Sequence, residues 1–263
     1  MCLILFSYNQ HPDYSLILAA NRDEFFNRPA NPLEFWEDEP SILAGKDLVG
    51  GGTWLGITRS RKFAALTNFR DPHDIKDNAP TRGDLVRNFL CGNQSPEKYL
   101  KQIRKVGHQY NGFNLLAGDQ DQLWYYSNHS PKIHRIQNGF HGLSNHLLNT
   151  PWPKVTKGKS KLTPIFSQPT IDIEATFQVL CDSSNPPADQ LPDTGVGTEW
   201  ERILAPLFIH SEIYGTRCCS LLTIKRTGEV LFVERTFSSI KQKVISQKTF
   251  SFTPGVRDTI HAG

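Results

Sequence analysis

The chain opens with two short runs that are apolar at almost every position, Cys2 to Tyr8 and Tyr14 to Ala20. Five residues rich in turn formers, from Asn9 to Asp13, separate them. This spacing predicts two antiparallel strands joined by a short turn. Because both runs are continuously apolar instead of alternating, we expect a sheet that is buried on both faces.

The remaining pattern groups strands with strands and helices with helices. Further strands are predicted at 53–58, 62–67, 113–117, 123–126, 132–136, 140–143, 220–225 and 230–235. Helices are predicted at 85–90, 95–107, 153–166 and 171–181, whereas 33–52 and 185–197 are expected to be irregular. This grouping favours stacked α+β layers over alternating βαβ units, within one domain spanning residues 1–263.

Composition excludes several classes of protein. The five cysteines are an odd number and form no CxxC pair, which argues against a disulfide framework and a four-cysteine zinc site. A formal charge of +3 is too small to indicate nucleic acid as a partner. The N-terminus lacks the basic segment of a signal peptide, and no stretch is long enough for a membrane span. We therefore expect a cytoplasmic protein with reduced thiols.

Cys2 is the first candidate for chemistry. Removal of Met1 would leave a chain that begins with a thiol and an α-amine on one residue. An α-amine with a pKa of about 7.7–8.0 is partly unprotonated near neutral pH, so it can accept the thiol proton. A thiol beside a base is an activated nucleophile. The alternative is a buried, inert thiol.

Four polar residues, Asn21-Arg22-Asp23-Glu24, directly follow the second predicted strand. Antiparallel pairing should bring them back near residue 2. Arg22 is expected to lower the pKa of the Cys2 thiol, and Asp23 to hold the α-amine. The alternative is a surface turn with an internal ion pair.

Weaker patterns have plainer explanations. A lysine run near Trp152 predicts a solvated helix face, with a site for anionic groups as the alternative; its members are Lys154, Lys157, Lys159 and Lys161. Cys218 and Cys219 are neighbours in a predicted strand, so we expect their side chains on opposite faces of the sheet.

A set of motifs in order along nearly the whole chain resembles the NRDE-domain family, also called the transport and Golgi organisation protein 2 family. The motifs are MCLILF at the start, NRDEFFNRP at 21–29, GGTWLG at 51–56, TNFR at 67–70, RG at 82–83, YNGFNL at 110–115, GLSN at 142–145, TPWPK at 150–154 and YGTR at 214–217. One departure is Cys218-Cys219-Ser220 after the last motif, where small hydroxyl residues are expected.

The resemblance implies a four-layer αββα sandwich of the N-terminal-nucleophile hydrolase type. In the cysteine members of that fold, the N-terminal cysteine works beside an arginine and an aspartate. By motif, Cys2 would be the nucleophile, with Arg22 and Asp23 as its electrostatic partners. Asn145 would donate to the oxyanion and Arg217 would steady the site, while Asn21, Glu24 and Asn68 are expected to contact substrate.

Three functions are compatible with this resemblance. The first is a cysteine amidohydrolase that cleaves a small-molecule linear amide by acyl transfer and requires no cofactor. The second is a non-enzymatic carrier of haem or of a lipid or acyl-CoA ligand, since the family is connected with haem trafficking, lipid homeostasis and Golgi organisation. The third is a retained fold that serves protein interactions.

Overall fold

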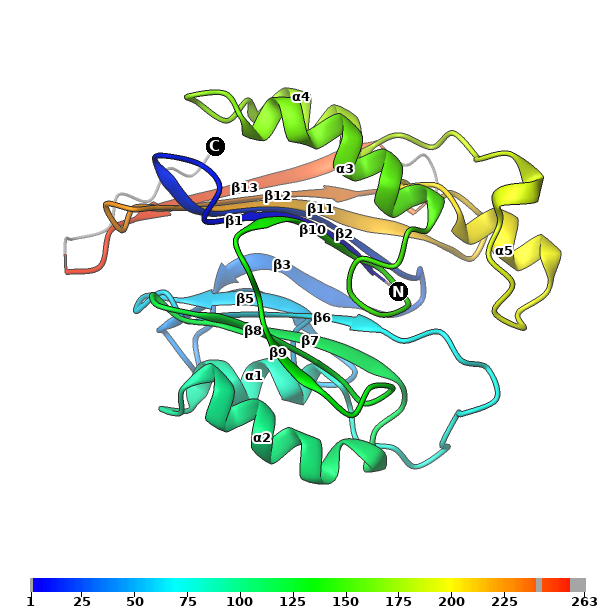
Figure 1. The fold of residues 1–263 in the computed structure, drawn as a ribbon, viewed down its shortest axis with the longest axis horizontal. Coiled ribbons are helices and arrows are strands. Elements are labelled where there is room, and N and C mark those ends of the chain that lie inside the picture. Colours follow the sequence, from blue (N-terminus) through cyan, green and yellow to red (C-terminus); the bar gives the residue numbers. More distant parts are fainter. Residues whose placement is uncertain (1, 240–242, 256–263) are drawn as a thin grey trace. The chain divides into compact units, whose positions relative to one another are not determined.

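The computed structural model describes residues 2–239 and 243–255. These residues form thirteen strands, five α-helices and two short 3-10 turns at Gly107–Gln109 and Ala188–Gln190. The chain divides into two compact units. Unit 1 comprises Met1–Asn27, Asn138–Ser144 and Leu148–Gly263, and unit 2 comprises Arg28–Gln137 and Asn145–Leu147. Each unit combines one antiparallel sheet with helices (Figure 1).

The sheet of unit 1 has six antiparallel strands in the order β10-β1-β2-β11-β12-β13. Their bounds are Gly139–Leu143 for β10, Cys2–Tyr8 for β1, Tyr14–Phe25 for β2, Tyr214–Lys225 for β11, Val230–Phe237 for β12 and Val244–Phe252 for β13. The two apolar N-terminal runs thus form β1 and most of β2. They lie in the middle of the sheet, as their continuous apolar character requires.

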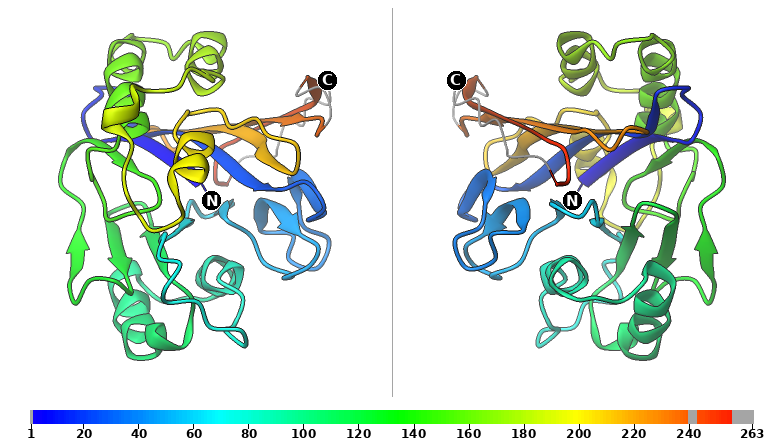
Figure 2. Two further views of the ribbon diagram at one scale, coloured as in Figure 1. Left: turned by 90° about the vertical axis from the view of Figure 1, so that its right-hand side faces the viewer. Right: turned by 90° about the vertical axis from the view of Figure 1, so that its left-hand side faces the viewer.

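Two helices, α3 (Pro153–Phe166) and α4 (Ile173–Leu180), cover one face of this sheet (Figure 1), and both views of Figure 2 show the same arrangement. The core between them is apolar and includes Leu5, Ile17, Leu162, Phe177 and Leu221. Helix α4 is capped by Asp172, whose carboxylate accepts a hydrogen bond from the Ala175 amide at 2.9 Å. A short helix, α5 (Thr198–Leu204), follows the Pro- and Gly-rich loop.

The sheet of unit 2 has seven antiparallel strands in the order β3 to β9. Their bounds are Ala30–Phe35, Ile42–Asp47, Leu55–Thr58, Phe63–Asn68, Phe113–Gly118, Leu123–Ser127 and Ile133–Arg135. Helices α1 (Gly83–Cys91) and α2 (Pro96–Val106) pack on it through a core that includes Leu85, Phe89, Leu100, Phe113 and Leu115. Pro96 begins α2 directly after Ser95, the position that a fixed φ favours.

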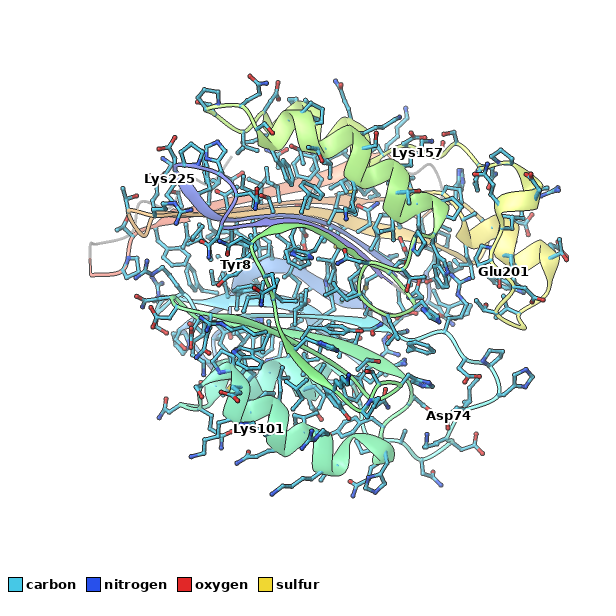
Figure 3. All side chains as sticks on the ribbon, viewed as in Figure 1. Tyr8, Asp74, Lys101, Lys157, Glu201 and Lys225 are labelled. Atoms are coloured by element: carbon cyan, nitrogen blue, oxygen red, sulfur yellow. The ribbon has the colours of Figure 1, made fainter. Side chains whose placement is uncertain are left out.

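The outward faces of the helices carry charge. Lys101 on α2 pairs with Glu97 one turn earlier at 2.6 Å, and Lys157 on α3 pairs with Asp182 at 2.8 Å. Both lysines point away from the sheet that their helix covers (Figure 3). Each helix therefore buries one stripe and exposes the other, as their periodicity predicts.

The structure confirms the α+β class and most predicted elements. It also differs from the predictions in one region, in the length of two strands and in two additional elements. Residues 33–52 are not irregular, because they include parts of β3 and β4. Strands β2 and β11 extend well beyond the predicted runs, to Phe25 and back to Tyr214. Strand β13 and helix α5 were not predicted. In each case hydrogen bonding to neighbouring strands, or packing on the core, overrides a weak local pattern.

Candidate active site

Cys2 begins β1 and stands directly opposite Arg22 of β2. Residues that face each other across antiparallel strands have their side chains on the same face of the sheet. On the other side of β2, Arg22 is in turn opposite Cys218 of β11. Cys2, Arg22 and Cys218 therefore form one row across the sheet. The predicted proximity of Arg22 to Cys2 follows from this register.

The motif Asn21 to Glu24 lies inside β2, not in a turn after it. This corrects the expected position of the motif, and strand alternation then separates its side chains onto two faces. Asn21 and Asp23 belong to the face that α3 and α4 cover, and Arg22 and Glu24 to the Cys2 face. Asn21 and Asp23 are almost completely buried, at 0% and 1% exposed.

Asn21 links β2 to two distant segments of unit 1 by hydrogen bonds. Its side-chain amide donates to the carbonyl oxygens of Leu180 at 2.9 Å and Leu207 at 2.8 Å. Both donors of the amide are thus used by backbone at the end of α4 and after α5. This geometry gives Asn21 a structural role, and its predicted contact with substrate stays a prediction.

Asp23 is held by Thr216 of β11, whose hydroxyl donates to its carboxylate at 2.7 Å. Burial raises the pKa of Asp23, and the nearby charge of Lys154 opposes that rise. Lys154 is itself only 3% exposed and donates to the Leu204 carbonyl at 2.9 Å. The prediction of a solvated lysine face is therefore wrong at Lys154, because Lys154 and Val155 in the first turn of α3 are buried. Nothing in the lysine spacing distinguishes Lys154 from its neighbours.

The Cys2 thiol is not activated in a chain that keeps Met1. Burial raises its pKa to about 11, whereas the positive charge of the N-terminus lowers it, Asp23 raises it and Arg22 lowers it. Cys2 is only 6% exposed, so loss of hydration outweighs the two cations. The predicted lowering by Arg22 is present, but it is smaller than the opposing effect of burial. Ser144 donates a long hydrogen bond of 3.5 Å to the Cys2 carbonyl.

Arg217 lies in a β-bulge of β11. Thr216 is opposite Asp23 and Cys218 is opposite Arg22, so Arg217 is an extra residue in the strand register. Its guanidinium donates to the Phe25 carbonyl at 2.9 Å, and burial together with the positive charge of Arg22 lowers its pKa. The bulge thus directs a second cation toward the Arg22 side of the sheet.

Sequence reasoning missed two polar residues of this face, Glu234 and Ser220, which are paired across β11 and β12. Glu234 is 4% exposed and accepts a hydrogen bond from the Cys218 thiol, whose pKa is raised by burial and by this carboxylate. The buried Ser220 hydroxyl has no hydrogen-bond partner among the described residues. The available signals were the alternate polar residues Glu234 and Thr236 of β12 and the hydroxyl of Ser220 beside the apolar Leu221.

The remaining predicted residues, Asn145 and Asn68, belong to unit 2. The Asn145 amide donates to the Asn68 carbonyl at 3.0 Å, and its own carbonyl accepts from the Arg70 amide at 2.8 Å. The structure therefore brings Asn145 and Asn68 together. Their roles as oxyanion donor and substrate contact stay predictions.

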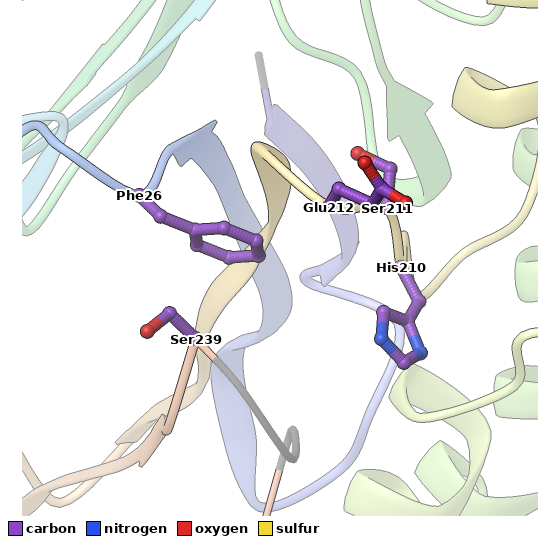
Figure 4. Close-up of a pocket in the computed structure, with 5 residues that line it drawn as sticks. All are labelled: Phe26, His210, Ser211, Glu212 and Ser239. Atoms are coloured by element: carbon purple, nitrogen blue, oxygen red, sulfur yellow. The ribbon is translucent and has the colours of Figure 1, made fainter.

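A hollow of about 570 Å³ lies on unit 1 next to the Arg217 bulge. Five residues line it: Phe26, His210, Ser211, Glu212 and Ser239 (Figure 4). Arg217 links it to the bulge, because its guanidinium carbon lies 5.9 Å from the centre of the Phe26 ring. The lining of this hollow thus combines an aromatic ring, an imidazole, a carboxylate and two hydroxyls.

Among residues 2–239 and 243–255, no group of three or more His, Cys, Asp or Glu side chains is arranged to hold a metal ion. In the same part of the chain, no helix is long and apolar enough to cross a membrane.

Comparison with solved structures identifies the fold. The chain matches the mutant C2A of a conjugated bile acid hydrolase from Clostridium perfringens over 100% of both chains, with a TM-score of 0.51 and 10% sequence identity. At this identity the likeness concerns the fold alone. The two antiparallel sheets with their helices therefore have the N-terminal-nucleophile hydrolase fold that the motifs imply.

Comparison with curated sequences identifies the family. The chain is 35% identical over 274 residues to the transport and Golgi organization 2 homolog of Mus musculus, covering 96% of this chain and 99% of that protein. It is 38% identical over 257 residues to the corresponding Bos taurus protein, covering 89% and 92%. The family model described as Transport and Golgi organisation 2 matches residues 1–239. The chain therefore belongs to the Transport and Golgi organisation 2 family.

Proposed function

We propose that the protein is a cysteine N-terminal-nucleophile amidohydrolase that cleaves a linear amide through Cys2. The observation that carries the proposal is the row of Cys2, Arg22 and Cys218 across β1, β2 and β11. The Arg217 bulge lies next to this row. Ionisable groups buried inside strands are costly to fold, so their concentration around residue 2 favours a functional site over a structural one.

The fold gives secondary support. The matched protein is named a conjugated bile acid hydrolase, and its crystal structure is that of the mutant C2A. Its name says that position 2 is a cysteine there, as it is here. At 10% identity this is support by analogy for the place of the nucleophile, and it says nothing of the substrate.

Removal of Met1 is the step that would activate the thiol. With Met1 present the pKa of Cys2 is about 11, so almost all of the thiol is protonated at neutral pH. After removal, the α-amine of Cys2 lies on the same residue as the sulfur and can take its proton. Arg22 then stabilises the thiolate, and the Asp23 carboxylate is the group of this motif suited to hold the α-ammonium.

Acyl transfer follows from this arrangement. The Cys2 sulfur attacks the amide carbonyl carbon, and the carbonyl oxygen becomes an oxyanion that the Asn145 amide is proposed to bind. The α-ammonium gives its proton to the leaving nitrogen, which departs as an amine and leaves a thioester on Cys2. Water then attacks the thioester, which releases the acyl group as a carboxylic acid and regenerates the thiol. Arg217 steadies the cationic side of the site, and Glu24 and Asn68 are the proposed substrate contacts.

A carrier of haem or of a lipid is the second candidate, and one feature of unit 2 favours it. The Phe69 ring stacks on the His129 ring at 3.9 Å between centroids and lies 5.0 Å from the His146 ring. Burial lowers the pKa of His146, which keeps its imidazole neutral and able to ligate iron. His129 and His146 would then hold haem beside an aromatic ring.

Intact-mass labelling tests the amidohydrolase proposal. The protein is treated with a thiol-reactive electrophile from about pH 5 to about pH 9, and the Cys2→Ala variant is the control. We expect loss of Met1 together with labelling of Cys2 below pH 8, and loss of amide turnover in the Cys2→Ala protein with an unchanged circular dichroism spectrum.

The Cys91→Ala variant is the matched control, because Cys91 is an exposed thiol outside the candidate site. It should change neither turnover nor Cys2 labelling. Retained Met1, or a Cys2 that labels only as its pKa of about 11 is approached, would contradict the proposal. Haem uptake that survives Cys2→Ala and is lost in His146→Ala would favour the carrier instead.

A further inference from the structure

A second pair of thiols lies away from Cys2, on the helix-covered face of the unit 1 sheet. Cys181 follows the last residue of α4 and is exposed, whereas Cys219 lies in β11 and is completely buried. Although 185–197 and α5 separate the two cysteines in the chain, the packing of α4 on β11 brings them close together.

Neighbouring contacts fix this geometry. Cys219 is directly opposite Asn21, whose amide donates to the carbonyl of Leu180, the residue before Cys181. Leu180 and Phe177 of α4 belong to the same core as Cys219. The end of α4 is therefore held against β11 by hydrogen bonds and by packing, which keeps the two cysteines close together in the folded protein.

The two thiols differ in reactivity. The hydrogen bond from Cys219 and the charge of Arg235 lower the pKa of Cys181 against the opposing effect of burial, whereas burial raises the pKa of Cys219. Arg235 is opposite Cys219 on β12, and its guanidinium stacks 4.3 Å from the Phe177 ring centre. Of the five cysteines, Cys181 alone has a lowered pKa; the pKa values of the other four are raised. An exposed thiol with thiolate character is the one that oxidants reach first.

We propose that Cys181 and Cys219 form a peroxide-sensitive dithiol, with Cys181 as the reacting thiol and Cys219 as the resolving thiol. The Cys181 thiolate attacks one oxygen of a hydroperoxide, the O–O bond breaks, and sulfenic acid forms as hydroxide or alkoxide leaves. The Cys219 sulfur then attacks the Cys181 sulfur, and its proton leaves with the hydroxyl group as water. The products are a disulfide, one hydroxide or alkoxide ion and one water molecule, and the hydroperoxide is the oxidant consumed.

The disulfide would enclose residues 182–218 in a covalent loop. This segment contains α5, Leu207, which binds Asn21, and the Arg217 bulge. The two side chains extend from neighbouring segments, so their movement toward the S–S length of roughly 2.05 Å would leave the end of α4 in place. Oxidation would thus restrain the segment that leads into the candidate site, independently of whether Cys2 turns over an amide.

Peptide mapping tests the proposal on the full chain. The protein is treated with equimolar hydrogen peroxide, blocked with iodoacetamide and digested. We expect a peptide pair joining Cys181 to Cys219, lighter by two hydrogens than the reduced pair, and reversal by a dithiol reductant. Before oxidation, Cys181 should alkylate several-fold faster than the exposed control thiol Cys91.

Variants assign the two roles. Cys219→Ala should trap sulfenic acid on Cys181 that a dimedone probe labels, and Cys181→Ser should abolish both the probe adduct and the cross-link. Cys218→Ala, the neighbouring residue on the opposite face, should leave the cross-link unchanged. Arg235→Gln should slow Cys181 alkylation, and Arg235→Lys should restore it.

Two outcomes would overturn the inference. One is alkylation of Cys181 no faster than that of Cys91 in the folded protein. The other is a cross-link that appears only after denaturation. The wild-type measurement decides on its own if a variant of the buried Cys219 does not fold.

Discussion

The two sheets bury different kinds of polar group. Within its strands, unit 1 buries Arg22, Asp23 and Glu234, and Lys154 of α3 is buried beside them. The strands of unit 2 bury neutral polar side chains in their described residues, chiefly Thr67, Asn114 and Ser127, and one charged side chain, Arg70, is buried just after β6. Asn114 donates to the Thr67 hydroxyl at 3.0 Å and accepts from the Tyr125 hydroxyl at 2.7 Å.

This difference separates a scaffold from a candidate site. A neutral hydrogen-bonded network costs little to bury and orients its strands, whereas a buried charge costs several kcal/mol unless it is well paired. A sheet that needed only stability would avoid four buried ionisable groups near one strand end. The polar face of unit 1 is therefore where selection for chemistry is expected, and four measurements address this comparison.

The largest effect is expected at Asp23. Asp23→Ala removes the acceptor of the Thr216 hydroxyl and the charge nearest Lys154, so we expect unfolding free energy to fall by about 3–5 kcal/mol in urea titrations. Asp23→Asn keeps the shape and a hydrogen-bond acceptor and should cost less. An equal loss in both variants would mean that shape alone matters at this position.

The same pair of proteins gives a pH test. Burial raises the folded-state pKa of Asp23, so between the unfolded and folded pKa values the native state binds the proton that the unfolded state has lost. The wild-type protein should therefore lose stability relative to Asp23→Asn as pH rises from about 4 through that window. A difference that grows toward acid pH instead would show that the ionised carboxylate is stabilising.

A matched pair of buried amides compares the units directly. Asn21→Ala in unit 1 leaves two backbone carbonyls without their donor, and Asn114→Ala in unit 2 disrupts the bonds to Thr67 and Tyr125. Each should cost about 1–3 kcal/mol of unfolding free energy. The Asn21→Ala loss should be accompanied by no change in the Michaelis constant for an amide substrate. A raised Michaelis constant at unchanged stability would restore the predicted substrate contact.

Arg217 should have the smallest effect on stability. Its side chain is partly exposed and donates to the Phe25 carbonyl, so Arg217→Ala should reduce unfolding free energy by about 1 kcal/mol or less. Any loss of turnover well beyond that, with Arg217→Lys in between, would then be an effect on the site. Unchanged turnover in both variants would remove Arg217 from the proposed mechanism.

Local patterns predicted much of the fold because they report local forces. The continuous apolar runs identified β1 and the first part of β2, and helical spacing of Leu85, Val86 and Phe89 identified α1. Strands β3, β4 and β13 were missed because they lack a clear alternating pattern and are held by neighbouring strands. For the site, the motifs placed Arg22 next to Cys2 in advance, and strand pairing accounts for that placement.

The sequence by itself determined that a cysteine follows Met1 and that a polar motif lies at the end of the second strand, because these are features of residue order. The tertiary structure decided which face each residue occupies. Once β2 continues to Phe25, alternation puts Arg22 with Cys2 and buries Asn21 and Asp23 under the helices. It also decided that burial raises the pKa of the Cys2 thiol and that Cys181 lies close to Cys219. Burial and contacts between distant segments exist only when the chain is folded, so no local pattern reports them.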